Sequence, residues 1–425
     1  MGKTFIICKH PESNQTMYDA ITNVAASPDA TVVVYGVQNL TPNPVRVFSK
    51  PNVHVITAED NKLDTDALQA ELLTHAPTCI VIVHTINVVD AICAALKGYI
   101  EGAPGLSVCL YCEIPRDLPL RKHFEALKAF ACAEGIAPRL KVFCSIKQHA
   151  ALLRLFVGAS DVKVLPPGVY AEQYHKLGKA AREALGVKDG EFAVLALGRI
   201  DTAVMAFADF VKRHPELNSK LIMPIDQNLK DTTIEMYVNE FAMRDLVPRD
   251  HIKKLILLRE IGVMSSEEIN IIMSACNVLL HANPVTDYNV HVHQGRLVGV
   301  PQIVPALPKD TEDLRDPGSL VRLVDTNFHF YIFDEYGGKL SMAGHREVAL
   351  ALLDVFENYA SFSEKALAGR DAPAPSWDAW KVAFTPPSSC VPPPVQPPFS
   401  KAEAYQSEID DLKQKLADIL LAVRA

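Results

Sequence analysis

The sequence contains no apolar run that approaches the roughly 20 residues of a membrane-spanning helix. The apolar stretch near the N-terminus, residues 4–8, is too short for the core of a secretory signal. Position 6 is isoleucine, where an N-myristoylation signal needs serine or threonine. We therefore expect a soluble cytoplasmic protein without membrane insertion, either free or incorporated into an assembly.

The sequence also lacks an excess of basic residues. The formal net charge is −8 over 425 residues, so the overall charge does not favour nucleic acid as a partner. Hydrophobic residues make up 49% and charged residues 22%, which is typical of globular proteins. A chain of this length exceeds one ordinary hydrophobic core, and it predicts two domains with additional segments.

A second cysteine pair that could complete a zinc site is absent. The nine cysteines are scattered, and the C-x-x-C formed by Cys109 and Cys112 stands alone. Most cysteines lie in apolar runs, so we expect buried free thiols in a reducing compartment. His291 and His293 are close in sequence but have no evident third ligand, and we therefore expect no metal site.

Short β-branched apolar runs alternate with amphipathic stretches along the chain. The predicted strands are residues 4–8, 31–35, 53–56, 79–84, 106–111 and 140–144, followed by 192–197, 220–225, 254–258, 277–281 and 301–305. The predicted helices include residues 66–75, capped by Thr65, 203–213, 231–243, 265–275 with a Ser265–Glu268 capping box, and 345–381. Continuous apolar strands separated by helices are typical of a parallel sheet covered on both faces. Because the alternation restarts after residue 170, we predict an α/β protein with two Rossmann-like doubly wound domains, residues 1–168 and 169–384.

The C-terminal region has a different composition. Residues 385–399 contain seven prolines, which predicts a stiff polyproline II linker. In residues 400–425, apolar side chains recur at alternating spacings of four and three, which is the heptad pattern of a short coiled coil. We expect this helix to form a homo-oligomer or to dock on a partner, although packing on its own domain is an alternative.

Several segments together resemble a known family. The segments "VLPPGVYAEQY" (164–174), "LALGRID" (195–201) and "GVPQIVP" (299–305) follow the order and spacing of GT-B glycosyltransferases of the retaining, glycogen-synthase-like type. That type is also called glycosyltransferase group 1, or family 4-like. The segment "PSWDAW" (375–380) resembles the closing helix of these proteins, which returns to the N-terminal domain, and "VIVHT" (81–85) lies near a family histidine. The resemblance implies the GT-B fold and a nucleotide-sugar donor, either UDP- or GDP-linked.

The same resemblance assigns candidate site residues. Arg199 matches the family arginine that stabilises the departing diphosphate, and the helix that starts near residue 290 would point its N-terminus at that group. Two family glutamates, which hold the donor sugar and ribose, fall on Thr286 and Gln294. A slip of one residue would offer Asp287 as a carboxylate instead. His84 would touch the sugar if it faced the ligand; the alternative is a hydrogen-bonded histidine at a strand end.

Other family features have no counterpart. The lysine that usually follows Arg199 is missing, and the first predicted strand is followed by "KHPESNQ", which has no glycine. Losing two charge-assisted contacts costs on the order of 1.5–3 kcal/mol each. Two functions therefore remain open. One is a weakly active transferase that moves a hexose to a glycan or protein acceptor and requires no cofactor beyond its donor. The other is a pseudoenzyme that serves as a structural or glycan-binding component of an assembly.

Overall fold

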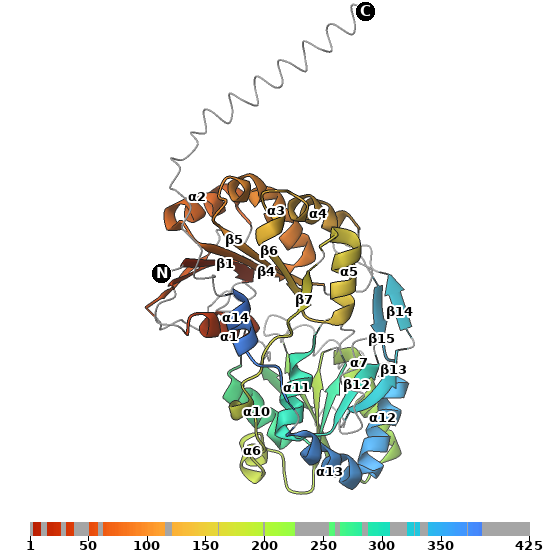
Figure 1. The fold of residues 1–425 in the computed structure, drawn as a ribbon. Coiled ribbons are helices and arrows are strands. Elements are labelled where there is room, and N and C mark those ends of the chain that lie inside the picture. The colour runs from red at the N-terminus through yellow and green to blue at the C-terminus, as the bar shows by residue number, and fades with distance from the viewer. Residues whose placement is uncertain are drawn as a thin grey trace, which may run out of the picture.

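The structure is a computed structural model with two separate α/β units (Figure 1). It describes residues 3–9, 15–26, 31–37, 51–57, 63–114, 121–159, 161–198, 200–225, 255–259, 264–282, 288–306, 321–326, 328–331, 339–371 and 373–384. The two main sheets have seven and six strands, and no strand is shared between them. This arrangement confirms the predicted pair of parallel-sheet domains.

The N-terminal sheet is entirely parallel, in the order β3-β2-β1-β4-β5-β6-β7. Its strands are β1 (Lys3–Lys9), β2 (Thr31–Val37), β3 (Val53–Thr57), β4 (Cys79–Thr85), β5 (Ser107–Glu113), β6 (Leu140–Cys144) and β7 (Val162–Val164). The central strands are buried along nearly their whole length because helices cover both faces of the sheet.

The two faces of this sheet have different coverings. One is packed by α2 (Thr65–His75), α3 (Ile86–Glu101), α4 (Glu125–Ala131) and α5 (Lys147–Val157). The other is packed by α1 (Gln15–Val24) and by α14 (Asp378–Phe384), which comes from the far end of the described chain. Cys109 belongs to the second face and Cys112 to the first, so this C-x-x-C does not form a metal-binding pair.

The C-terminal sheet is also parallel, in the order β10-β9-β8-β11-β12-β13. Its strands are β8 (Phe192–Leu197), β9 (Ser219–Ile225), β10 (Leu255–Arg259), β11 (Val278–His281), β12 (Gln302–Ala306) and β13 (Val321–Asp325). The main helices around it are α6 (Lys179–Ala184), α7 (Ile200–Arg213), α10 (Ser266–Ala275), α11 (Val290–Val298), α12 (His345–Glu357) and α13 (Tyr359–Gly369). An antiparallel hairpin, β14 (Phe328–Tyr331) with β15 (Lys339–Met342), adds a small third sheet that the sequence did not predict.

Two segments of the chain pass between the domains, and these segments lie side by side. The backbone N–H of Val169 donates to the Pro375 carbonyl at 2.8 Å, and the Trp380 indole donates to the Pro166 carbonyl at 2.9 Å. Gly168 lies so close to Trp377 that a Cβ would stand 2.5 Å from the Trp377 nitrogen, which explains the glycine. Figure 1 shows the result: α14 lies beside α1 in the N-terminal domain, as the "PSWDAW" resemblance predicted.

Two helix starts test the predicted caps. The Ser265–Glu268 capping box is confirmed, with Ser265 Oγ accepting from the Glu268 N–H and the Glu268 carboxylate accepting from the Ser265 N–H. The Thr65 cap is wrong by one residue. Asp64 caps α2 by accepting from the N–H groups of Asp66 and Ala67. A carboxylate at this position also interacts favourably with the helix dipole, which a threonine hydroxyl does not.

The predicted helix 231–243, the linker 385–399 and the coiled-coil helix 400–425 lie outside the described residues. Within the described part of the chain, seven cysteines are buried free thiols, as predicted, and Cys132 is exposed. No helix in that part is both long and apolar enough to cross a membrane.

Candidate functional site

Each parallel sheet has one point where the chain reverses its direction of winding. In the N-terminal sheet it lies between β1 and β4, and in the C-terminal sheet between β8 and β11. At such a point the loops leave neighbouring strands in opposite directions, so ligands bind outside the carboxyl ends of those strands. The residues that end these four strands are therefore the first candidates for a site.

In the N-terminal sheet, charged residues lie at the edge of the point between β1 and β4 where the strand order reverses (the switch point). Lys9, the last residue of β1, forms an ion pair with Glu113, the last residue of β5. His84 lies between them on β4 and is fully buried. Its Nδ1 accepts a 2.9 Å hydrogen bond from the Thr85 N–H, and its Nε2 has no hydrogen-bond partner among the described residues.

His84 is held in its neutral form. Burial and, to a lesser extent, the nearby Lys9 charge lower its pKa to about 4, against an opposing effect of Glu113. Because Nδ1 accepts from a backbone N–H, the ring hydrogen of the neutral form is on Nε2. The structure thus places His84 as a buried strand-end histidine, and a sugar would reach Nε2 only if the surrounding residues moved.

The C-terminal switch point lies where β8 and β11 end. β8 is followed by Gly198, whose φ of 109° is in a region that favours glycine, and α7 begins at Ile200. Arg199 falls between these two residues and is itself outside the described residues. β11 ends at His281, and Thr286 and Asp287 lie in the undescribed segment between β11 and α11.

Gln294 is the one family glutamate position that the structure describes. It is 6% exposed and lies on α11, where its Oε1 is 2.7 Å from His291 Nδ1. Its Nε2 donates a 2.8 Å hydrogen bond to the hydroxyl of Tyr174, 120 positions earlier in the chain. The amide is therefore already engaged on both sides by the protein.

The N-terminus of α11 is capped from within the chain. Asn289 Oδ1 accepts from the His291 N–H at 3.1 Å, and Asn289 Nδ2 lies 3.2 Å from His281 Nδ1. His281 Nε2 in turn lies 2.8 Å from Gln302 Oε1, and Gln302 Nε2 donates to the Val292 carbonyl. This buried polar network fixes the start of α11. According to the family resemblance, the N-terminus of this helix would face the donor diphosphate.

The network carries no charge at neutral pH. Burial lowers the pKa of His281 to about 4, against an opposing hydrogen bond from Gln302, and burial also lowers the pKa of His291. His293, which stacks on Tyr288 at 4.9 Å between ring centroids, has its pKa lowered to about 4 by burial and by Arg296. His291 and His293 therefore have different partners. The described residues contain no group of three metal-ligating side chains.

No protein-family model matches the chain, and no curated protein sequence matches it. Solved structures do. A sucrose-phosphate synthase from Thermosynechococcus elongatus has a TM-score of 0.66 at 14% identity, covering 90% of this chain and 97% of that one. HepE from Anabaena, in complex with UDP and glucose, has a TM-score of 0.60 at 12% identity over 90% and 98%. UDP-GlcNAc 2-epimerase from Neisseria meningitidis, bound to UDP-GlcNAc, has a TM-score of 0.51 at 13% identity over 90% and 98%.

These likenesses define the fold of the chain. It has the GT-B fold, as the sequence resemblance predicted. The neighbours include both a synthase and an epimerase, so the fold alone does not choose a reaction.

Sequence reasoning missed Tyr174, His281 and Gln302. Tyr174 lies within the quoted segment "VLPPGVYAEQY", but nothing in the sequence indicates that it meets Gln294. His281 and Gln302 sit at a strand end and a strand start, where apolar residues surround them in sequence. Their shared signal is that each is a polar residue beside a predicted buried strand, and such residues need a partner.

Proposed function

We propose that this chain binds a nucleoside diphosphate sugar, with UDP as the first candidate nucleotide, at the carboxyl edge of its C-terminal sheet. The supporting observation is the switch point between β8 and β11, where Gly198 leads into Arg199 and α11 begins nearby. HepE and the Neisseria epimerase are described with UDP-containing ligands, which supports the same ligand class here. Arg199 would stabilise the diphosphate, Gln294 the ribose, and Thr286 or Asp287 the sugar.

Calorimetry on wild type and Arg199→Ala tests this proposal. UDP, GDP and UDP-glucose are titrated into each protein, and we expect Arg199→Ala to weaken UDP binding by roughly tenfold to 100-fold, because a charge-assisted contact is lost. Arg213→Ala, at the exposed far end of α7, the helix that follows Arg199 in the sequence, is the matched control and should keep wild-type affinity. Equal UDP affinity in wild type and Arg199→Ala would remove Arg199 from the site.

Catalysis is the second part of the proposal. We expect retaining hexosyl transfer to a glycan or protein acceptor to be slow, because the family lysine and both glutamates are absent. Release of UDP from UDP-glucose, followed with and without an acceptor, measures it. Rapid release that Arg199→Ala abolishes would show that other residues have replaced the missing ones, and the slow-turnover proposal would be wrong.

One observation favours the alternative, a non-catalytic structural or glycan-binding module. The described polar groups around α11 bond one another and are neutral, so this part of the site presents no carboxylate to a sugar. A protein that retained the fold and lost the chemistry would show this pattern. Absence of UDP and GDP binding in the titrations above would select this alternative.

The C-terminal segment suggests a partner. We propose that residues 400–425 form a helix that self-associates or docks, with residues 385–399 as its tether. Deleting residues 386–425 should leave the melting temperature unchanged, because we expect the proline-rich tether to hold the helix away from the two domains. Light scattering should show a smaller particle for the truncated protein. If both proteins have the same size and the truncation melts at a much lower temperature, the helix packs on its own domain instead.

A further inference from the structure

Tyr174 lies where the segment that joins the two domains enters the C-terminal domain. It is 4% exposed, and its hydroxyl accepts a 2.8 Å hydrogen bond from Gln294 Nε2 on α11. Four residues earlier, Tyr170 makes a similar bond to a different domain, since its hydroxyl accepts from the amide of Asn23 on α1. Two tyrosines of one segment therefore each hold a side-chain amide, one in each domain.

The partners of Gln294 fix the orientation of its amide. Gln294 Nε2 donates to Tyr174, so Oε1 faces His291 and requires that His291 Nδ1 carry the ring hydrogen. A glutamine amide has two hydrogens and two oxygen lone pairs, and among the described residues His291 and Tyr174 are its only hydrogen-bond partners. One N–H and one lone pair of this amide therefore remain without a partner among the described residues.

We propose that Tyr174 and His291 are positioning residues that orient the Gln294 amide for a vicinal diol. This inference rests on the proposed function and specifies how this chain holds the ribose of the donor. A carboxylate only accepts hydrogen bonds, whereas an amide donates one and accepts one. Two adjacent hydroxyls can satisfy both roles at once, one as acceptor and one as donor. A ligand that lacks either hydroxyl leaves one of these groups without a partner.

The test compares two ligands on two proteins. UDP and 2′-deoxy-UDP are titrated into wild type and Tyr174→Phe, which removes only the hydroxyl that holds Gln294 Nε2. We expect Tyr174→Phe to weaken UDP by about threefold to tenfold, the size of one neutral hydrogen bond. The affinity for 2′-deoxy-UDP should change by less than about twofold, because the diol contact is already incomplete. Loss of discrimination between the two ligands is the readout that a purely structural tyrosine would not give.

Tyr170→Phe is the matched control, because it removes the same hydroxyl from a tyrosine of the same segment that bonds an amide in the other domain. It should keep the wild-type preference for UDP. Gln294→Met, which keeps the side-chain volume and removes both polar atoms, should reproduce the loss of discrimination and serves as a second variant if Tyr174→Phe does not fold.

The outcomes separate the two proposals. Suppose that wild type binds UDP, and that Tyr174→Phe lowers the affinities for UDP and 2′-deoxy-UDP equally or leaves both unchanged. The positioning role is then wrong and the proposed function stands. The same conclusion follows if wild type binds both ligands with equal affinity. If wild type binds no UDP, the proposed function fails and the positioning role fails with it.

Discussion

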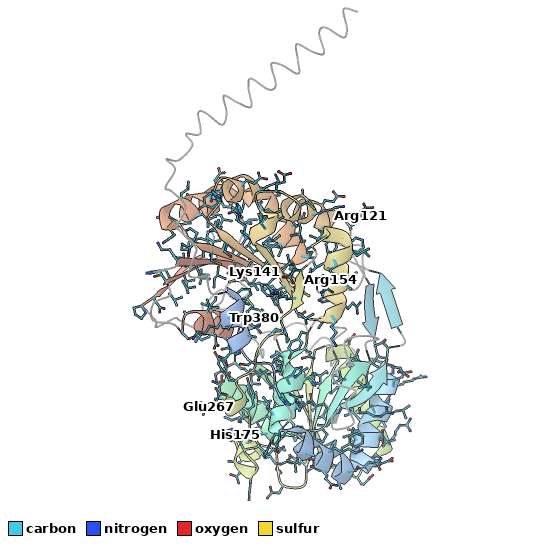
Figure 2. The ribbon with its side chains drawn as sticks, viewed as in Figure 1. Arg121, Lys141, Arg154, His175, Glu267 and Trp380 are labelled. Atoms are coloured by element: carbon cyan, nitrogen blue, oxygen red, sulfur yellow. The ribbon has the colours of Figure 1, made fainter. Side chains whose placement is uncertain are left out.

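Replacing Trp380 by alanine is expected to lower the free energy of unfolding of the N-terminal domain by roughly 3–5 kcal/mol, the usual cost of removing a buried tryptophan side chain. Trp380 is 1% exposed, and its ring lies 4.6 Å from Tyr111, 5.3 Å from Trp377 and 5.1 Å from Phe384 between centroids. Figure 2 shows it on α14, beneath the N-terminal sheet in that view. The residue thus belongs to the core of a domain whose sheet ends more than two hundred residues earlier in the chain.

Urea unfolding followed by circular dichroism measures this effect. Trp380→Phe separates the contribution of aromatic packing from that of the indole hydrogen bond. It keeps an aromatic ring and loses the hydrogen bond to the Pro166 carbonyl. Val382→Ala is the control on the same helix, where the side chain is 77% exposed, and it should change stability by no more than about 0.5 kcal/mol. An unchanged unfolding midpoint for Trp380→Ala would mean that α14 is not part of the N-terminal core.

Much of the fold was predictable because the parallel strands are buried on both faces. A strand such as β8 or β4 has no solvent-facing side, so its sequence is a short apolar run whose limits agree with the structure to within a residue or two. The hairpin β14–β15 was missed because seven residues separate its two strands, which is longer than the common hairpin loops of about two to five residues.

The candidate site was only partly predictable. Alignment of motif positions found Gln294, because spacing along one segment is a local property. The contact with Tyr174 was not found, because it joins residues 120 positions apart and depends on how the interdomain segment crosses α11. The state of His84 also depends on the fold: only the packing of α3 and its neighbours decides whether a histidine at a strand end is exposed or buried.

Acidification from about pH 6.5 to pH 4 is expected to unfold this protein. Burial lowers the pKa of His84, His281 and His293 to about 4 in the folded protein, from 6.5. Between these values the histidines are neutral when folded and protonated when unfolded, so the unfolded chain binds more protons and stability falls as the pH falls. Each contributes on the order of 3 kcal/mol across that range, so His281 and His293, which share the C-terminal domain, together reach the lower part of the 5–15 kcal/mol of a typical domain. Below about pH 4 their contribution no longer changes.

Urea midpoints measured at intervals from pH 7.5 to pH 4 test this expectation. His293→Phe keeps the stacking on Tyr288 and removes one titrating group, so its stability should decline less steeply with acid than that of wild type. His54→Gln, at an exposed position on β3, is the matched control and should follow the wild-type curve. Carboxylates also titrate toward the acid end, but they are common to all three proteins, so the comparison isolates the buried histidine. Parallel curves for His293→Phe and wild type would show that His293 is already protonated in the folded protein, or that it exchanges with solvent without unfolding.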